Sequence, residues 1–476
     1  MRGAPSVPPG AGGVHFIGIS GIGMSGLARI LLQRGVRVSG SSDRATPLTR
    51  QLTAEGALVS IGHDAANLGR ARTVVVSSAI GGDNPELAAA WARRLDVVHR
   101  GALLARLMRE RRGIAIAGTH GKTTTTAMVA RVLEAGGLDP AVVVGGERMD
   151  TGSNAHDGTG AWFLSEADES DFSFLDLQPE IAVVTNIEND HIASDAGLPG
   201  LVAAFERFAG SLPPQGLVLV GVDEPRAASL ATRPRSARTR TFGFAASALV
   251  RAVRATYAGF GSRFDVVVDG IPAGAIELCV PGAINVCDAL PAVAIGLELG
   301  VSFATIAAAL AGFRGVRRRF EILAETARLS VVDDYAHHPT AVAATIAAAR
   351  ENFRGPIVVA FQPHRYTRTQ YLAGEFARAL RAADQVVLTD IYAASETPLE
   401  GVDATTIGAR LRALGGEVAY VRGVEELPAY LLAHAPPGAL VLALGAGSIT
   451  GAAHDLADAL TKLGERDVAA LGMRAG

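Results

Sequence analysis

The sequence predicts an α/β protein made of three domains with parallel sheets. Apolar, strand-like runs alternate with helical patterns along the whole chain, which is typical of parallel strands joined by helices. The length of 476 residues suits about three domains of roughly 150 residues each. Two charged stretches, RLMRERRG at 106–113 and FRGVRRRFEIL at 313–323, are the candidate boundaries between them.

These boundaries divide the chain into four segments. Residues 1–13 lack the apolar segment of a signal peptide or membrane anchor, and we expect a disordered tail there. The three domains then cover 14–109, 110–322 and 323–476.

The first domain opens with a strand, a glycine-rich turn, a helix and a second strand, in the runs VHFIGI, SGIGMSGLARILLQRG and VRVSG. Two further strand-like runs, TVVVSSAI and VVHR, complete the pattern. The order of these elements predicts a parallel sheet with its glycine turn at the carboxyl end of the first strand.

The glycine turn has the spacing of a diphosphate-binding loop. Gly21, Gly23 and Gly26 would let the backbone approach a diphosphate at the helix N-terminus, and Gly18 adds to the turn. Asp43 lies near the position of a ribose-binding acid in nicotinamide cofactor sites. Three interpretations remain open from the motif alone: NAD(P), another diphosphate such as a UDP-sugar, or a tight structural turn.

The central domain continues the alternation. IAIAG, AVVVGG, AWFLSEADESD and IAVVTNIENDH predict strands, and a helical stretch near 200–210 precedes the strand GLVLVGVDE at 216–224. Segment 231–275 alternates apolar and polar residues, which predicts β-hairpins within the same domain. An alanine-rich stretch at 287–312 predicts a long helical region.

The last domain contains four more strand-like runs, each ending in polar or glycine-rich residues. They are LSVVDDYAHHPTAV, PIVVAFQPHRYTRT, QVVLTDIYAAS and ALVLALGAGSIT. Because ligands bind at the carboxyl ends of strands in open α/β sheets, we expect the chemistry at these ends.

The composition excludes several classes of protein. A formal net charge of −3 gives no basic field for nucleic acid. No apolar run reaches the roughly 20 residues that a membrane helix needs. The two cysteines, Cys279 and Cys287, make a disulfide framework unexpected, which fits a reducing cytoplasm. We expect a cytoplasmic monomer or homodimer that neither binds nucleic acid nor inserts into a membrane.

The loop GTHGKTTTTAMV at 118–129 stands between a predicted strand and a predicted helix. It has the glycines, Lys and Thr of a phosphate cradle, although Ile116 stands six residues before Lys122, where the longer cradle has Gly. The backbone N–H groups and Lys122 would hold ATP phosphates, and Thr123 would bind Mg²⁺. A glycine turn with an incidental lysine is the alternative.

The phosphate loop has a lysine, Lys122, in a chain whose basic residues are almost all arginines. Only two of the 44 basic residues are lysines, Lys122 and Lys462. Since the chain otherwise uses arginine, Lys122 indicates a need for a compact ammonium on a flexible stem rather than a planar fork. A chance distribution of the two lysines is the alternative.

Carboxylates end two neighbouring strands, in SEADESD at 165–171 and NIENDH at 186–191, and such groups near a phosphate loop suit Mg²⁺. The first run holds four acids, which are Glu166, Asp168, Glu169 and Asp171. They cannot all point inward, so we expect some to serve as charges at a helix N-terminus. His191 taken alone favours a structural role.

Two further clusters lie around and beyond the second boundary. One of Arg317, Arg318 and Arg319 could reach a γ-phosphate across a domain gap, although such a run is usually a solvated face. In the last domain, acids, imidazoles and arginines crowd two strand ends and suit a carboxylate-bearing substrate, with a polar domain interface as the alternative. They are Asp333, Asp334, Tyr335, His337, His338, His364, Arg365 and Arg368.

A series of motifs in one order carries a resemblance to a known family. They are GISGIGMSGLA, SSAI with NPE, GTHGKTTTTAMV, EADESD, VTNIENDH, GVRRRFE, DDYAHHPT, QPHRYTRT and GAGSIT. With these motifs the chain resembles the Mur ligase family from about Val14 to Leu460. The most specific pieces are GTHGKTTTTAM, EADESD and DDYAHHPT.

The resemblance implies a Rossmann-like N-terminal domain for a UDP-sugar, a P-loop-type central ATPase domain and a Rossmann-like C-terminal domain for an amino acid. It decides the first glycine loop in favour of a UDP-sugar. The branch resembled here joins L-alanine to the carboxylate of UDP-N-acetylmuramate through an acyl phosphate, forming ADP, in peptidoglycan precursor synthesis. A murein peptide-recycling ligase on the same sugar and a catalytically impaired UDP-sugar-binding homologue are the alternatives, and an NAD oxidoreductase is a more distant one.

The resemblance also implies residue roles. The catalytic set is Lys122, Arg318, Arg319 and His191. The ATP-binding set is Gly118, Thr119, His120, Gly121, Lys122, Thr123, Thr124, Asn285 and Asp334. The UDP-sugar set is Gly18, Gly21, Gly23, Met24, Ser25, Ser42, Ser78, His99 and Arg100. The amino-acid set is Tyr335, His337, His364 and Arg365. The Mg²⁺ ligands are Thr123, Glu166 and His191.

Several positions separate this chain from its relatives. Sister ligases that use a carbamoylated lysine are excluded as a class, because no lysine lies between 123 and 461. The family usually has G-R-H-N or G-R-H-M followed by Asn, where this chain has Ala283, Ile284 and Asp288. Ala193 and Ser42 stand where Asp is usual. We expect activity, because the phosphate loop and its metal ligands are kept, and an effect of the departures on nucleotide and substrate affinity.

Overall fold

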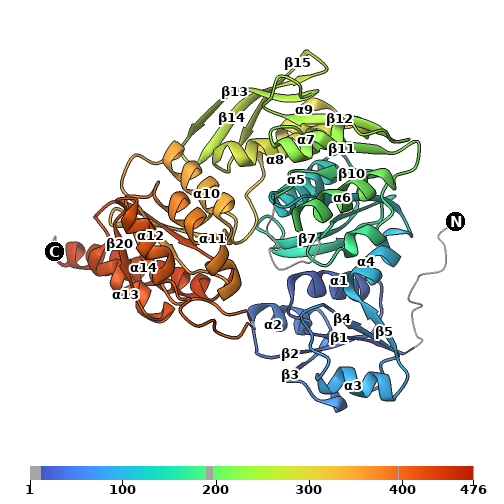
Figure 1. The fold of residues 1–476 in the computed structure, drawn as a ribbon, viewed down its shortest axis with the longest axis horizontal. Coiled ribbons are helices and arrows are strands. Elements are labelled where there is room, and N and C mark those ends of the chain that lie inside the picture. The colour runs from blue at the N-terminus through green and yellow to red at the C-terminus, as the bar shows by residue number, and fades with distance from the viewer. Residues whose placement is uncertain (1–11, 189–196, 395, 475–476) are drawn as a thin grey trace.

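The protein folds into three α/β lobes, each built on one mainly parallel sheet (Figure 1). The structure is a computed structural model that describes residues 12–188, 197–394 and 396–474. The predicted fold class is confirmed. The domain limits drawn from the sequence stay predictions. Among the described residues, no helix has the length and apolar character needed to cross a membrane.

The N-terminal lobe is a five-stranded parallel sheet in the order β3-β2-β1-β4-β5. Its strands are β1 (Val14–Ile17), β2 (Val38–Ser42), β3 (Leu58–Ile61), β4 (Thr73–Val76) and β5 (Asp96–His99). Its helices are α1 (Ile22–Gln33), α2 (Pro47–Ala54), the 3₁₀ helix η1 (Ala65–Leu68), α3 (Pro85–Ala92) and α4 (Arg100–Met108). The chain leaves β1 toward β2 on one side, and β4 lies on the other. The glycine turn after β1 therefore faces the crevice where such sheets bind ligands.

The central lobe is a ten-stranded sheet in the order β15-β14-β13-β12-β11-β10-β6-β9-β7-β8. Its strands are β6 (Arg112–Ala117), β7 (Ala141–Arg148), β8 (Ser153–Asp157), β9 (Trp162–Glu166), β10 (Ile181–Val184), β11 (Leu217–Gly221), β12 (Arg238–Gly243), β13 (Val250–Ala258), β14 (Gly261–Val268) and β15 (Ile271–Leu278). Its helices are α5 (Lys122–Ala135), the 3₁₀ helix η2 (Ser173–Asp176), α6 (Gly197–Gly210), α7 (Pro225–Ala231), α8 (Gly282–Glu298) and α9 (Phe303–Ala311).

Of two sequence predictions for this lobe, the structure confirms one and corrects the other. The predicted hairpins are confirmed, because β13, β14 and β15 pair antiparallel in succession. The region predicted as helical at 287–312 is helical over most of its length, but it begins earlier, at Gly282, and is interrupted after Glu298. It is two helices, α8 and α9, and the second begins where the Ser302 hydroxyl accepts the Thr305 N–H at 3.1 Å. The residues between the two helices, LGVS at 299–302, include no alanine, and the Ser302 cap starts the second helix after them.

The C-terminal lobe is a six-stranded sheet in the order β16-β17-β21-β18-β19-β20, parallel except for β16. Its strands are β16 (Glu321–Glu325), β17 (Leu329–Asp334), β18 (Ile357–Phe361), β19 (Gln385–Leu388), β20 (Val418–Tyr420) and β21 (Ala439–Leu444). Its helices are α10 (Pro339–Asn352), α11 (Tyr366–Leu380), α12 (Thr405–Ala413), the 3₁₀ helix η3 (Val424–Glu426), α13 (Leu427–His434) and α14 (Ile449–Arg474). The four predicted strands are the four inner ones. The sequence missed β16 and β20 here and β3 in the first lobe, all edge strands that bury little of their surface.

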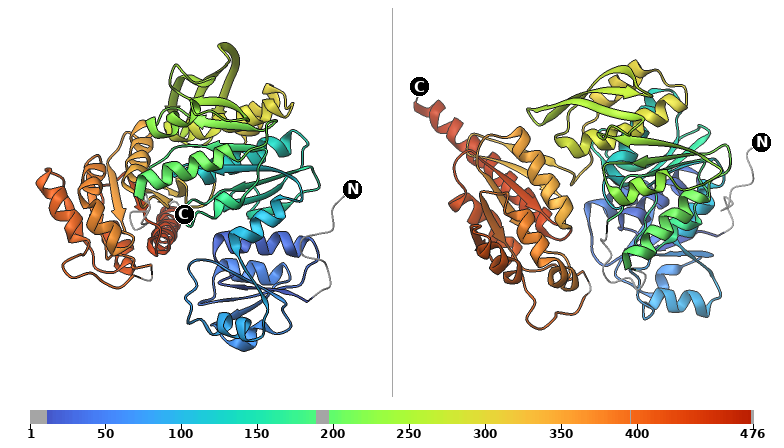
Figure 2. Two further views of the ribbon diagram at one scale, coloured as in Figure 1. Left: turned by 45° about the vertical axis from the view of Figure 1, so that its right-hand side comes forward. Right: turned by 45° about the horizontal axis from the view of Figure 1, so that its top comes forward.

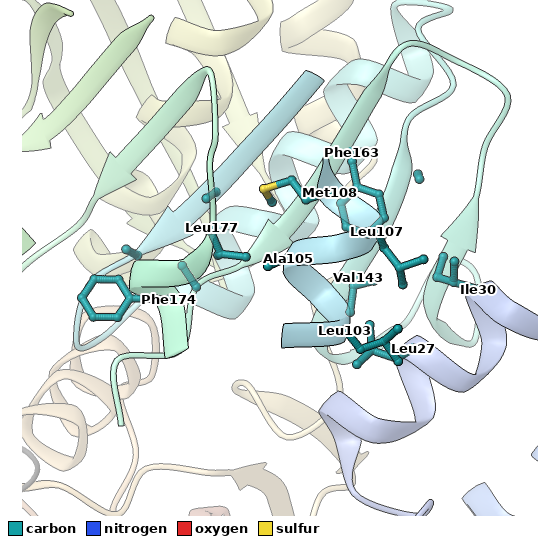
Figure 3. Packing of buried hydrophobic residues seen from close by; sticks show 14 of the residues in the cluster. Leu27, Ile30, Leu103, Ala105, Leu107, Met108, Val143, Phe163, Phe174 and Leu177 are labelled. Carbon is teal, nitrogen blue, oxygen red and sulfur yellow. The ribbon is translucent and has the colours of Figure 1, made fainter. Parts of the chain in front are cut away.

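The lobes are joined in two different ways. The N-terminal and central lobes share one apolar cluster, in which Leu27 of α1 and Leu103 of α4 pack near Val143 of β7 (Figure 3). The clusters of the C-terminal lobe consist mainly of its own residues, with Phe260 of the β13–β14 turn packed against them. The right-hand view of Figure 2 shows this lobe beside the other two. Near the site the central and C-terminal lobes meet through polar contacts such as Thr340 with Glu188 and through the packing of α8 against α10.

Candidate active site

A cavity of ≈ 910 Å³ lies where the three lobes meet. Its walls come from α1 and α4 of the first lobe, the phosphate loop and the ends of β7 and β9 in the central lobe, and the end of β17 with α10 in the third. The cavity therefore gathers strand ends from separate sheets, as predicted from the polar endings of the strands.

The phosphate loop connects β6 to α5, and Lys122 is the first residue of the helix. Its Nζ lies 2.5 Å from the carbonyl oxygen of Gly118, 3.0 Å from that of Thr119 and 2.8 Å from Glu169 Oε2. Burial acts to lower the pKa of Lys122, but the carboxylates around it, Glu169 first, outweigh burial and raise the pKa above its ordinary value. Lys122 is thus held charged at the N-terminus of α5, where anions bind.

Glu166 and Thr123 lie together on the wall of the cavity and fit the predicted Mg²⁺ site. Burial raises the pKa of Glu166, against the Thr123 hydroxyl and the charges of Lys122 and Arg319. Among the described residues, Glu166 Oε1 is buried without a hydrogen-bond partner. A Cβ added to Gly145 would lie 2.1 Å from Glu166 Oε2, so the bare backbone there makes room for the carboxylate. A buried carboxylate oxygen with no donor beside a hydroxyl suits a hard dication.

The other three acids of this run, Glu169, Asp168 and Asp171, have different partners. Glu169 is 3% exposed and pairs with Lys122. Burial would raise the pKa of Asp168, but Arg100 and then Lys122 lower it to about 2, with Arg100 Nη2 at 2.6 Å. Asp171 accepts the N–H of Ser173 at the start of η2, which is the helix-terminal role expected for some of these acids.

The three arginines at the second boundary have different partners, although Arg318 and Arg319 both lie over the ring of Tyr335. Arg319 Nη2 donates to Thr123 Oγ1 at 3.3 Å, which brings its guanidinium to the phosphate loop from the far side of the cavity. Arg318 donates to the carbonyl oxygen of Gly445 at 2.7 Å and lies over the ring of Tyr335, with 4.9 Å between them. Arg317 is 51% exposed and pairs with Glu321. The solvated-face alternative therefore describes Arg317 alone.

The predicted amino-acid residues form a chain of rings at the ends of β17 and β18. Tyr335 and His337 line the cavity, and the His337 ring lies 5.4 Å from that of His364. Arg365 is exposed and directly precedes α11, at φ 70. Asp334 accepts the N–H groups of Phe320 and Ala336 at 2.8 and 2.7 Å, so it also fixes the turn that carries the arginines.

The region of the family departures lies at the start of α8, against the phosphate loop. Asn285 lines the cavity, and its side chain donates to the carbonyl oxygen of Pro281 at 2.6 Å. Asp288 also lines the cavity and is 6% exposed. Burial raises the pKa of Asp288 to about 8, although Arg319 and Thr125 act in the opposite direction.

The predicted UDP-sugar residues are spread over the strand ends of the first lobe. Gly23 and Arg100 line the cavity, whereas Met24 and Ser25 are buried in α1, where the Ser25 hydroxyl accepts a hydrogen bond from Asn154 of β8 at 3.0 Å. Four more positions end strands or follow them: Gly18 and Gly21 after β1, Ser42 in β2 and Ser78 after β4. His99 ends β5 and accepts the N–H of Gly101. Asp43 is exposed and pairs with His63.

Some parts of the site were not assigned from the sequence. Glu188 lies 3.3 Å from His120 and 4.0 Å from His338, and this contact joins two lobes. The partner of Lys122, Glu169, was one of four acids that the sequence could not tell apart. Both cysteines are free thiols, as expected. His191 and Ala193 lie outside the described residues.

Three family models match the chain one after another. The models described as Mur ligase family, catalytic domain, Mur ligase middle domain and Mur ligase, glutamate ligase domain match residues 13–112, 116–296 and 318–447. The UDP-N-acetylmuramate–L-alanine ligase of Acidothermus cellulolyticus is 47% identical over 439 residues, covering 92% of each chain.

Solved structures agree with this result. The UDP-N-acetylmuramate-alanine ligase of Thermotoga maritima is 30% identical with a TM-score of 0.82, covering 95% of this chain and 99% of its own. The murein peptide ligase of Psychrobacter arcticus is 23% identical with a TM-score of 0.71, covering 94% and 98%, and shares the fold. With its phosphate loop, its three lobes and these three matches in order, the chain belongs to the Mur ligase family.

Proposed function

We propose that the chain is an ATP-dependent, ADP-forming ligase that joins L-alanine to the carboxylate of UDP-N-acetylmuramate in peptidoglycan precursor synthesis. The observation that carries the proposal is the single cavity in which Lys122, Arg319 and Tyr335 meet from the central lobe, the second boundary and the C-terminal lobe. Relatives named for this reaction align over nearly the whole chain, which supports it.

The reaction needs an activated acid. A carboxylate resists attack by an amine because its oxygen is a poor leaving group. Transfer of the γ-phosphoryl group of ATP to that oxygen gives an acyl phosphate and ADP. The neutral amine of L-alanine then attacks the carbonyl carbon, the amide bond forms, and inorganic phosphate leaves with the electrons of the broken C–O bond.

The residues of the cavity suit the charge that moves in the first step. Lys122 is fixed by two carbonyl oxygens and Glu169, so its ammonium is already in place when phosphates arrive. Arg319 reaches the same loop from the opposite side. Preorganised cations around a transferring phosphoryl group are the main source of catalysis in this chemistry.

Thr123 and Glu166 would hold Mg²⁺ within this arrangement, with His191 as a further ligand by resemblance. The ion would supply a Lewis acid that neutralises charge on the phosphate oxygens. Two observations support the assignment: Glu166 Oε1 has no hydrogen-bond partner among the described residues, and the backbone of Gly145 leaves room for the carboxylate.

The remaining walls accommodate the two other substrates. We assign the UDP-sugar to the crevice above the glycine turn of the first lobe, with Gly23 and Arg100 facing the cavity. We assign L-alanine to the C-terminal lobe, beside Tyr335, His337, His364 and Arg365. We place the reaction in the cytoplasm, which the two free cysteines support.

One assay tests the whole proposal. Phosphate release should require ATP, UDP-N-acetylmuramate and L-alanine together, and the amide product should appear in equal amount. No release from folded protein would favour a UDP-sugar-binding homologue without catalysis. A preference for the tripeptide when it competes with L-alanine would instead identify a peptide-recycling ligase.

A further inference from the structure

Two histidines and a glutamate converge between the central and C-terminal lobes. His120 belongs to the phosphate loop, Glu188 follows β10, and His338 immediately precedes α10. His120 Nε2 lies 3.3 Å and His338 Nδ1 4.0 Å from the same oxygen, Glu188 Oε2. The three ligand atoms all lie within 4.8 Å of one another, and this is the one such group found in the described part of the chain.

The backbone fixes the two members from the central lobe. Thr119 Oγ1 accepts the N–H of Glu188 at 2.9 Å, and the His120 N–H donates to Asn186 Oδ1 at 2.9 Å. The phosphate loop and the segment after β10 are therefore tied together on both sides of the pair. His120 and Glu188 keep their separation without help from a ligand.

The third member, His338, belongs to the C-terminal lobe and is buried there. His338 is 7% exposed, and its ring lies 5.3 Å from that of His120. Two residues further on, Thr340 Oγ1 donates to Glu188 Oε2 at 2.5 Å. Hydrogen bonds to a ligating carboxylate are the usual support of a metal site, because they orient the ligand.

The type of ligand decides which metal suits this cluster. Zinc binds imidazole nitrogen and carboxylate oxygen at roughly 2.0–2.2 Å, so ligand atoms around a tetrahedral ion stand about 3.3–3.5 Å apart. The distance of 3.3 Å between His120 Nε2 and Glu188 Oε2 already matches this spacing. The distance of 4.0 Å between His338 Nδ1 and Glu188 Oε2 needs to shorten only slightly. Mg²⁺ prefers oxygen ligands, so the cluster differs in selectivity from the pair Thr123 and Glu166.

We propose that His120, Glu188 and His338 form a binding site for a transition-metal dication of the zinc class, which bridges the phosphate loop and the C-terminal lobe. His120 and His338 both line the main cavity, so the ion has a route of entry, and water completes its coordination. A bound ion adds a link between the lobes beside the hydrogen bond that Thr340 donates to Glu188. The site does not depend on the proposed ligase reaction, since all three ligands belong to the protein.

Cobalt titration tests the site directly. The metal-free full-length protein is titrated with Co²⁺ in excess Mg²⁺ and without substrates, and its visible absorption is recorded. We expect one Co²⁺ per chain with the intense bands of a four-coordinate nitrogen–oxygen site, displaced by Zn²⁺. Binding only at millimolar Co²⁺, or weak six-coordinate bands, would overturn the proposal.

Two substitutions and a control locate the signal. Glu188→Gln keeps the volume of the side chain, and His338→Ala removes the ligand of the C-terminal lobe; each should weaken Co²⁺ binding by at least about tenfold. His156→Ala removes a histidine that also pairs with an acid, Asp139, but is 54% exposed and should leave binding unchanged. Zn²⁺ should raise the melting temperature of the parent and not that of Glu188→Gln. A cobalt spectrum that survives either ligand substitution would refute the bridging site.

Discussion

The carboxylate of Asp288 occupies the space that a side chain at Gly121 would need. A Cβ built on Gly121 would lie 2.2 Å from Asp288 Oδ1, and the backbone of Gly121 is left-handed with φ 82. The phosphate loop and the start of α8 are thus in contact at a position where the family usually has Asn. The raised pKa of Asp288, about 8, means that the neutral carboxyl takes the place of a neutral amide at physiological pH.

This contact predicts a pH-dependent stability. Asp288 keeps its proton in the folded protein up to about pH 8 and loses it near 3.8 in the unfolded chain. The folded state therefore binds more protons between these values, and the free energy of unfolding falls as the pH rises through this window. Asp288→Asn should remove that part of the slope in urea unfolding measured from about pH 4 to 9. The exposed control Asp455→Asn should keep the slope of the parent, and equal slopes for Asp288→Asn and the parent would contradict the prediction.

Lys122 should tolerate no replacement, even by another cation. Lys122→Arg keeps the charge, but the planar fork does not fit between the carbonyl oxygens of Gly118 and Thr119 and the Glu169 carboxylate. We expect kcat/KM in the three-substrate assay to fall by about 10²-fold or more. Lys462→Arg, at the exposed position of the other lysine, is the matched control and should leave turnover unchanged. Near-normal turnover of Lys122→Arg would remove the role assigned to the ammonium.

Arg319 and Arg317 provide a test variant and a matched control for the role of the arginine run. Arg319→Ala removes the guanidinium that contacts Thr123, and kcat should fall by about 10²–10³-fold because charge on the transferring group loses a partner. Arg317→Ala removes a half-exposed side chain paired with Glu321 and should change kcat by less than about threefold. Steady-state kinetics at saturating substrates measures both. Equal losses in the two variants would mean that the run acts only as a structural hinge.

The absence of a side chain at Gly145 should affect the concentration of Mg²⁺ that the enzyme needs. In Gly145→Ala the new methyl group would meet Glu166 Oε2 and displace the carboxylate. We expect the Mg²⁺ concentration for half-maximal activity to rise by at least about tenfold. Gly451→Ala adds a methyl group within α14 that meets nothing within 4 Å, and it should need no extra Mg²⁺. An unchanged Mg²⁺ requirement in Gly145→Ala would argue against Glu166 as a ligand.

The fold class, the inner strands and the chemical character of the phosphate loop could be predicted from the order of the residues alone. Those features depend on local information: buried parallel strands are continuous apolar runs, and a loop of glycines, Lys and Thr has few uses other than holding phosphate. Edge strands such as β3 and β20 escaped detection because they bury little and so need no strong apolar pattern.

Which polar residues act together depends on the packing of the three lobes and could not be predicted. Along the chain, Glu166, Asp168, Glu169 and Asp171 are equivalent acids, and Arg317, Arg318 and Arg319 are equivalent cations. Their partners lie far away in sequence: Glu169 pairs with Lys122, Asp168 with Arg100, and Arg319 with Thr123. The pKa of Asp288 and the meeting of Glu188 with two histidines likewise arise from burial and from the packing of separate lobes. Burial and interlobe distance depend on how whole sheets stack, and no local pattern of residues encodes them.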